Sequence, residues 1–265
     1  MVTLMMNKLT FILLFWTTSN LCWSQATPSL GELKIVSFEE TYCHRRDSVL
    51  ASNPDSIEFW CDTVCTHVAF DFVYFEGTPS LAAVLIADQI NFNIIHHLLP
   101  EDVTYSTYSD MLMVQENNSH EFAEDTECGA TVMTTLPQLY AVSIGYGGYG
   151  CGAAHPYFGS ELYNYNPVNG QQLHWDDFFD ADQQTALTVI AEDAWKDTLK
   201  GEAWVQDYGE FFLTQDFLFD EDGLHLFYDP YEIAPYAMGA PEILLSPKQF
   251  RPLLRKDCLI KNAYK

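Results

Sequence analysis

The chain has 265 residues, of which 48% are hydrophobic and 15% aromatic, enough apolar material for one sizeable core or two small ones. Its formal net charge is -25 at pH 7, because 37 acidic residues stand against only 12 basic ones. This balance excludes nucleic acid as a natural partner, since phosphate binding needs clustered Lys and Arg. The resulting field attracts cations, basic peptides and basic proteins, although acidity on an exported protein also serves solubility alone.

The N-terminal segment has the order of a secretory signal. Lys8 supplies a basic start, an apolar run follows over Leu9–Trp16, and small residues lie at Ser24 and Ala26. The run is shorter than the about 20 apolar residues that a membrane-spanning helix needs. We therefore predict that residues 1–24 are a cleaved signal peptide, that the protein is secreted or periplasmic, and that it has no transmembrane helix. The alternative is a lipid anchor on Cys22, but the segment before it lacks the small residue that lipoprotein processing requires.

Six cysteines remain in the predicted mature chain, and an even number in an exported protein suggests disulfides. The candidates are Cys43, Cys61, Cys65, Cys128, Cys151 and Cys258. Their pairing does not follow from the sequence. The alternative is a metal site on Cys61, Cys65 and His67, but no second set of ligands stands at zinc-like spacing. We predict neither a metal nor a cofactor.

A first module is predicted over residues 25–125. Leu33–Phe38 favours a strand, residues 41–62 contain turn motifs, and Val68–Phe75 has the β-branched and aromatic residues typical of a buried strand. A helix is predicted from Leu81 to Leu99, because Pro100 ends it. The stripe expected to face the core consists of Leu81, Leu85, Phe92, Ile95 and Leu99. The polar, acidic residues 116–129 suggest the boundary to the next module.

A second module is predicted over residues 126–265 and begins with shorter elements. Strands at 136–146 and 157–166 flank a glycine-rich loop at 147–156. Asn169-Gly170 then predicts a hairpin turn, because both residues tolerate positive φ, and the returning strand is expected over 173–179.

The last part of this module is predicted to contain a helix and a second hairpin. Apolar residues recur at three and four positions over 183–200, which indicates one buried helix face. Residues 211–219 and 224–228 are expected to pair across an acidic turn. Because the order is not an alternation of βαβ units, the predicted class is α+β, with mostly antiparallel sheets and one helix packed on each module.

Two loops have compositions that suit a contact surface. Tyr146–Pro156 is rich in glycine and alanine, which lets a ligand approach the backbone closely. Tyr228–Pro241 contains prolines and tyrosines, as in a rigid loop that presents aromatic anchors. The same tyrosines could instead cover the edge of a core, and composition does not separate these possibilities.

The same loops resemble a known exported domain. Gly152–Pro156, Tyr163–Asn166 and the run Tyr228–Ala237, with 169–179 and 222–242 around them, are similar to the extracytoplasmic domain of RsiV-type anti-sigma factors. That domain also occurs beside the peptidoglycan deacetylase PdaC and in exported bacterial proteins of unknown function. The resemblance spans roughly residues 136–254 and is weaker over 33–112. It implies an exported α+β domain that binds a ligand at the cell envelope, and in the RsiV branch that ligand is lysozyme, a basic protein.

The chain also departs from that branch. It has no recognisable sigma-binding segment, transmembrane helix or deacetylase domain, so we expect neither an anti-sigma factor nor a deacetylase. Gly152-Ala153 stands where two glycines are usual, which is expected to tighten the loop and to alter what it accepts.

These observations predict a non-enzymatic envelope protein that binds a wall-associated or basic protein ligand such as lysozyme. The candidate ligand-binding residues are Tyr149, His155, Tyr231, Glu232 and Tyr236. One alternative is a hydrolase of cell-wall glycan or peptide, in which Asp229 and Glu232 supply paired carboxylates and His155 a base. No Gly-x-Ser-x-Gly or His-Glu-x-x-His motif supports that alternative, so no catalytic residue is predicted. A structural secreted protein without a specific ligand is the other alternative.

Overall fold

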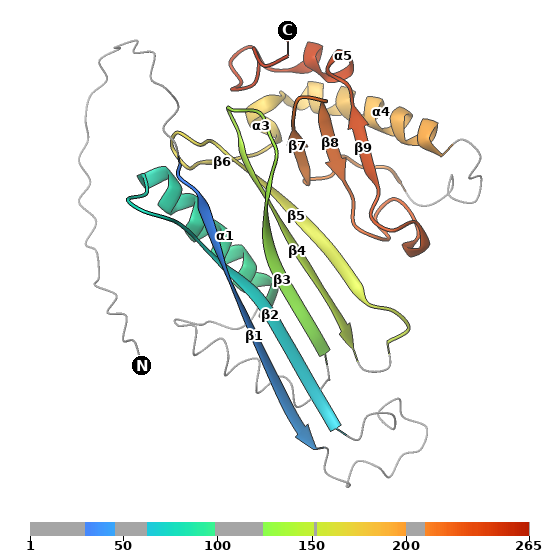
Figure 1. The fold of residues 1–265 in the computed structure, drawn as a ribbon. Coiled ribbons are helices and arrows are strands. Elements are labelled where there is room, and N and C mark those ends of the chain that lie inside the picture. The colour runs from blue at the N-terminus through green and yellow to red at the C-terminus, as the bar shows by residue number, and fades with distance from the viewer. Residues whose placement is uncertain (1–29, 46–62, 99–123, 151–152, 200–209, 265) are drawn as a thin grey trace.

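The computed structural model describes residues 30–45, 63–98, 124–150, 153–199 and 210–264. In these ranges one large sheet has a long helix on one face. A smaller sheet, which carries a second long helix, lies beside the later strands of the large sheet (Figure 1). No helix in these ranges is both long and apolar enough to cross a membrane. The predicted signal peptide lies outside the described residues, as do Cys22, Cys61 and Cys151.

The large sheet has six strands in sequence order. They are β1 (Leu33–Arg45), β2 (Thr63–Phe75), β3 (Glu124–Met133), β4 (Tyr140–Gly150), β5 (Tyr157–Tyr165) and β6 (Gln172–Leu173). Neighbouring strands are antiparallel, except that β2 and β3 run parallel. Helix α1 (Leu81–Leu98) stands between these two strands in the sequence, as parallel pairing requires.

The predicted α+β class with mostly antiparallel strands agrees with this arrangement, but the parallel pair was not foreseen. Strand β3 begins inside the segment that was predicted to separate two modules, so strands from both sides of residue 125 belong to one sheet. Residues 41–45, predicted as loop, continue β1, and residues 147–150, also predicted as loop, continue β4. The division into two modules stays a prediction.

Helix α1 buries a different face from the one predicted. Its buried residues are Ala82, Ala83, Ile86, Ala87, Ile90, Asn91, Ile94 and Leu98. Leu81 is 76% exposed and Phe92 63% exposed, so the predicted stripe points largely to solvent. Both stripes are apolar, and the small alanines of the buried one allow the helix to lie close to the strands.

Polar side chains complete the hydrogen bonding where β2 and β3 separate. The parallel register ends at Phe70 opposite Cys128. Beyond it the Ala130 amide donates to Asp71 Oδ2 at 3.1 Å, and the Asn91 side chain bonds both the amide and the carbonyl of Val73, at 2.8 and 2.9 Å. Buried backbone groups need partners, so these side chains allow the sheet to open without losing its hydrogen bonds.

The second sheet is small and antiparallel, with strands β7 (Phe217–Phe219), β8 (Leu224–Phe227) and β9 (Glu242–Leu245). Helix α4 (Ala181–Thr198) packs against β9. The short helices are α3 (Trp175–Phe178), α5 (Pro247–Phe250), η3 (Tyr236–Met238) and η4 (Arg251–Leu253). The predicted hairpin and long helix are thus confirmed, whereas the strand expected over 173–179 is mostly helix α3.

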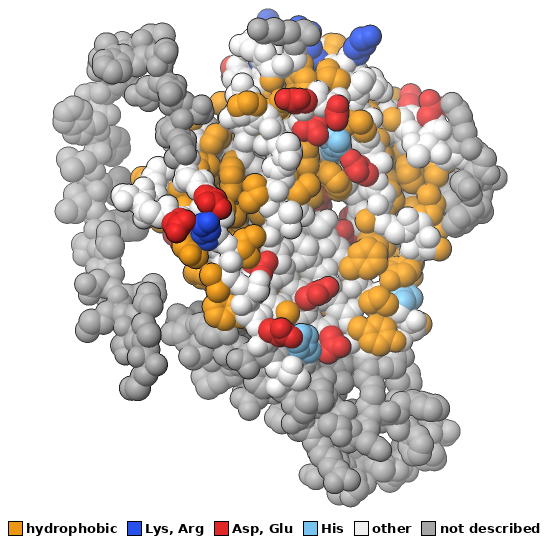
Figure 2. All heavy atoms as spheres, viewed as in Figure 1, with side chains coloured by type: hydrophobic (Ala, Val, Ile, Leu, Met, Phe, Trp, Pro, Cys, Tyr) orange, Lys and Arg blue, Asp and Glu red, His pale blue; other side chains and the backbone are white. Residues whose placement is uncertain are grey.

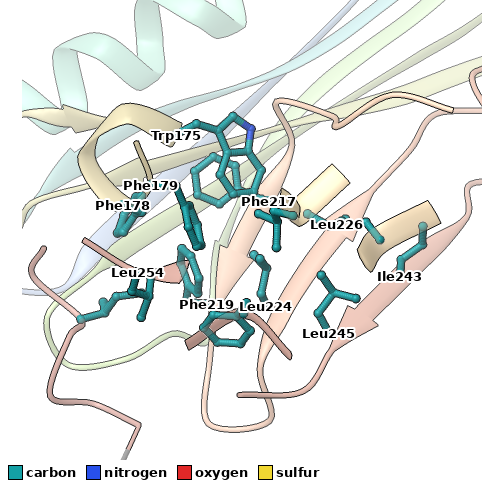
Figure 3. Packing of buried hydrophobic residues seen from close by; sticks show 14 of the residues in the cluster. Trp175, Phe178, Phe179, Phe217, Phe219, Leu224, Leu226, Ile243, Leu245 and Leu254 are labelled. Carbon is teal, nitrogen blue, oxygen red and sulfur yellow. The ribbon is translucent and has the colours of Figure 1, made fainter. Parts of the chain in front are cut away.

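Aromatic side chains fill the space between these elements (Figure 3). Trp175 stacks on Phe217 with a centroid distance of 3.8 Å, and Phe178 packs edge-on against the same ring. The Trp175 indole donates to the Thr214 carbonyl at 2.8 Å, so this buried ring leaves no polar atom without a partner. This cluster anchors the second sheet and the loop that leads into β7.

Among the described residues, Cys128 and Cys258 are free thiols, so the disulfide prediction is wrong at these two positions. Cys128 is buried in the cluster beneath α1, and Cys258 is buried in the cluster that includes α4. Burial raises the pKa of Cys128 to about 12 and also raises the pKa of Cys258. Both remain protonated at neutral pH and act as small apolar side chains.

A histidine on β8 is expected to make stability depend on pH. The His225 ring lies 2.5 Å from Glu242 Oε1 and 2.9 Å from Asp220 Oδ1. Burial alone would lower the pKa of His225, but the two carboxylates outweigh it and raise the pKa. Because folding raises this pKa, the protonated His225 ring stabilises the folded state. This stabilisation is fully present at a pH below the pKa of the unfolded state and is lost as the pH rises through the pKa of the folded state. Replacing His225→Gln should cost about 1–2 kcal/mol at about pH 5.5 and much less at about pH 8.5, measured by urea unfolding. An equal loss at both pH values would contradict this assignment.

Candidate functional site

Three of the five predicted site residues meet on the surface. His155 lies between β4 and β5, and its ring stacks on Tyr236 with a centroid distance of 4.0 Å. Its Nε2 lies 3.2 Å from the hydroxyl of Tyr231, and the Tyr236 hydroxyl donates to the Pro156 carbonyl at 2.9 Å. Phe158 adds its ring edge-on against Tyr236. We call these four side chains, His155, Phe158, Tyr231 and Tyr236, the aromatic platform.

The aromatic platform faces solvent and does not cover the core. Tyr231 is 54% exposed, Phe158 43% and the neighbouring Met238 37%. Figure 2 shows hydrophobic side chains gathered on this side of the molecule, over the start of β5 and the segment between β8 and β9. Exposed apolar groups that cluster in this way mark contact surfaces more often than scattered ones do.

The backbone at Tyr231 is held in an uncommon conformation. With φ at 77°, Tyr231 is the one non-glycine residue with positive φ among the described residues. Such a conformation costs on the order of 1–3 kcal/mol and persists only where surrounding contacts fix it. The Tyr231 amide donates to the Ala234 carbonyl at 3.0 Å, and the Asp229 amide donates to Glu232 Oε2 at 2.7 Å. The loop is thus bonded to itself in a shape that points the Tyr231 ring outward.

Asp229 clamps this loop to the large sheet. Its Oδ1 accepts from the Ser160 amide on β5 and its Oδ2 accepts from the Tyr146 hydroxyl on β4, both at 2.9 Å. A Cβ on Gly159 would lie 2.2 Å from Asp229 Oδ2, so glycine is required for the carboxylate to come this close. Burial and the bond to Asp229 raise the pKa of Tyr146, which therefore remains a donor.

A second carboxylate holds the same edge of β5. Asp216 Oδ1 accepts from the Leu162 amide at 2.7 Å, two residues along the strand from Ser160. Burial raises the pKa of Asp216 to about 6, against the Leu162 hydrogen bond, and the charges of Glu161, Asp229 and Glu232 raise it further. The second sheet is therefore joined to the first through carboxylates on strand amides.

The last turn of α1 contacts the same region. His97 stacks on Tyr146 with a centroid distance of 4.4 Å, and its Nε2 lies 3.2 Å from Glu161 Oε2. The bond from His97 and a further bond from Tyr163 lower the pKa of Glu161 despite its burial. Sequence reasoning missed His97, Tyr146 and Asp216, because no local pattern distinguishes them from other aromatic and acidic residues.

The hydrolase alternative finds little support in this geometry. Both oxygens of Asp229 accept structural hydrogen bonds, and Glu232 accepts from the Asp229 amide within its own loop. Partial burial of its carboxyl group raises the pKa of Glu232, although the residue as a whole is exposed beside the aromatic platform. The remaining predicted site residue, Tyr149, donates its hydroxyl to the Ala153 carbonyl at 2.9 Å.

The face of the large sheet opposite α1 contains a shallow groove of about 500 Å³. Gly129 and Gly145 lie opposite each other in its floor. Its polar lining consists of Ser37, Glu39, Asp71, Glu127, Thr131 and Ser143. Ser37 donates to Asp71 Oδ1 at 2.6 Å, and Figure 2 shows acidic side chains on this face. The groove therefore adds an acidic surface to the face of the large sheet that lies opposite α1.

Comparison with known proteins places one part of the chain in a described family. Residues 176–247 match the model of a protein family of unknown function, DUF3298. These residues form a DUF3298 domain. They include Asp216, Asp229, Tyr231, Glu232 and Tyr236, whereas His155 and strand β5 lie outside the match. No curated protein matches the chain.

Two solved structures share the fold. A DUF3298 family member from Bacteroides fragilis is 20% identical, with a TM-score of 0.62, and a DUF3298 family protein from Pseudomonas aeruginosa is 17% identical, with a TM-score of 0.60. Each alignment covers 86% of this chain and 96% of the other. The likeness therefore extends well beyond the DUF3298 domain to most of the described sheet. The association with RsiV-type and PdaC proteins remains a resemblance of motifs.

Proposed function

We propose that this protein is a non-enzymatic binding protein of the cell envelope whose ligand is a basic protein, with lysozyme as the first candidate. The observation that supports this most directly is the aromatic platform, in which two loops distant in sequence hold exposed rings together on one face. Tyrosine is a frequent anchor of protein interfaces, because its large ring loses little conformational entropy on binding.

The charge of the molecule supports a basic ligand. The formal net charge of -25 would steer a cationic protein toward the surface, and Glu232 stands beside the platform. The strained backbone of Tyr231 also supports a binding role, since strain retained at a surface residue commonly reflects function. Binding such a ligand requires that the protein be exported, and export is what the N-terminal segment predicts.

Retention of lysozyme on the immobilised mature protein tests the proposal. At about 50 mM salt we expect lysozyme to be retained, and at about 500 mM the electrostatic part of the affinity should weaken. Cytochrome c, another basic protein, controls for attraction by charge alone and should elute earlier. Absence of lysozyme retention at low salt, or equal retention of the two proteins, would contradict the proposal.

Substitutions in the aromatic platform test the site itself. Tyr231→Gly removes the ring and also suits the positive φ, so the loop should keep its shape while affinity falls on the order of 10- to 100-fold. Tyr236→Ala should act similarly. Tyr74→Ala is the matched control, because Tyr74 is 43% exposed on β2 and does not belong to the platform. Calorimetric titration gives the affinities, and unchanged affinity in both platform variants would exclude this surface.

A further inference from the structure

The end of the β1–β2 ladder brings two cysteines into register. The antiparallel pairing runs from Leu33 opposite Phe75 to Arg45 opposite Thr63 without a bulge. Near its end Cys43 stands directly opposite Cys65. These two residues are 22 positions apart in sequence, and the sequence alone gave no reason to prefer them among the possible pairs.

Direct opposition satisfies the backbone requirement for a cross-strand disulfide. Opposed residues on antiparallel strands have Cα atoms about 4.5–5.5 Å apart, and disulfides span about 4.4–6.8 Å between Cα atoms. Opposed residues also belong to the same face of a sheet. Cys128 and Cys258, in contrast, are buried as free thiols in two different clusters.

We propose that Cys43 and Cys65 form a disulfide that fastens β1 to β2. The two thiols lose two protons and two electrons as the S–S bond forms, and the disulfide of a thiol oxidoreductase or of oxidised glutathione accepts them and becomes two thiols. Within the described residues β1 is an outer strand that pairs with β2 alone. A covalent link near its end would hold this strand in place. In the cell the bond rests on the predicted export, since oxidising compartments preserve disulfides.

Peptide mapping can identify the bond without ambiguity. The full chain is treated with oxidised glutathione, alkylated under denaturing conditions without reductant, and cut with trypsin and a protease that cleaves before aspartate. Cys43 then lies in Ile35–Arg45, Cys65 in Asp62–Phe70 and Cys61 in Asp55–Cys61. We expect a mass for Ile35–Arg45 linked to Asp62–Phe70, which disappears on reduction. Alkylation of both cysteines, or a link between Ile35–Arg45 and Asp55–Cys61, would overturn the proposal.

Thermal unfolding gives an independent measurement. Reductant should lower the Tm of the oxidised protein by roughly 6–12 °C, the effect of opening a loop of this size in a domain of this size. The double variant Cys43→Ser/Cys65→Ser should lose this response, whereas Cys258→Ala should retain it, because Cys258 is a free thiol. A full reductant response in the double variant would show that another pair is responsible.

Discussion

Replacing Asp229→Ala is expected to destabilise the protein by about 2–4 kcal/mol and to weaken ligand binding at the same time. The substitution leaves the Ser160 amide and the Tyr146 hydroxyl without their partner, and each unsatisfied buried or half-buried donor costs about 1–3 kcal/mol. It also releases the loop that holds Tyr231 from the sheet. The urea midpoint of unfolding measures the first effect, and lysozyme affinity measures the second.

Two controls make this prediction specific. Asp193→Ala removes an exposed carboxylate from α4 and should change stability by less than about 0.5 kcal/mol. Asp229→Asn keeps an oxygen for the Ser160 amide, so its loss should be intermediate. If Asp229→Ala unfolds at the same urea concentration as Asp193→Ala, the carboxylate does not clamp the loop.

Replacing Asp216→Asn should stabilise the protein at neutral pH. The folded state raises the pKa of Asp216 from 3.8 to about 6, mainly through burial. A raised pKa means that the folded state binds this proton more tightly than the unfolded state does. The stabilisation by the protonated Asp216 carboxyl group is therefore fully present below about pH 3.8 and is lost as the pH rises through about 6. At about 1.4 kcal/mol per pH unit, the penalty above that range amounts to about 3 kcal/mol.

The asparagine variant keeps the contact and removes the charge. Its side-chain oxygen can still accept from the Leu162 amide, and its NH2 group can face Thr214 Oγ1, which lies 3.5 Å from Asp216 Oδ2. We expect a gain of about 1–3 kcal/mol at about pH 7.5 and almost no difference at about pH 4, measured by urea unfolding of both proteins across this range. Asp216→Ala should lose stability instead, because the Leu162 amide then lacks an acceptor. An asparagine variant that is less stable at pH 7.5, or a difference that does not vary with pH, would contradict the assignment.

Some of this molecule follows from local sequence. The helices α1 and α4 and the hairpin of β7 and β8 were predicted, because their periodicity, turn residues and proline stops act over a few neighbouring positions. The loop between β8 and β9 was also predicted, from its proline and tyrosine content, whereas the glycine-rich segment predicted as a loop belongs to β4 as far as Gly150. The composition alone established the strong acidity that favours a basic ligand.

The tertiary structure decided the features that depend on distant residues. Both stripes of α1 are apolar, so only packing on the strands selected the one with Ala82 and Ala83. Strand β3 was missed because its acidic residues resemble a linker, and its parallel pairing with β2 requires the α1 crossover.

The candidate site shows the same division between sequence and structure. His155 and Tyr231 were each suspected from the sequence, but their contact joins residues 76 positions apart. Asp216 and Asp229 look like ordinary loop acids until the half-buried amides of β5 that no neighbouring strand pairs are seen to need acceptors. Local sequence determined which side chains the loops offer, and the satisfaction of strand hydrogen bonds determined where those side chains meet.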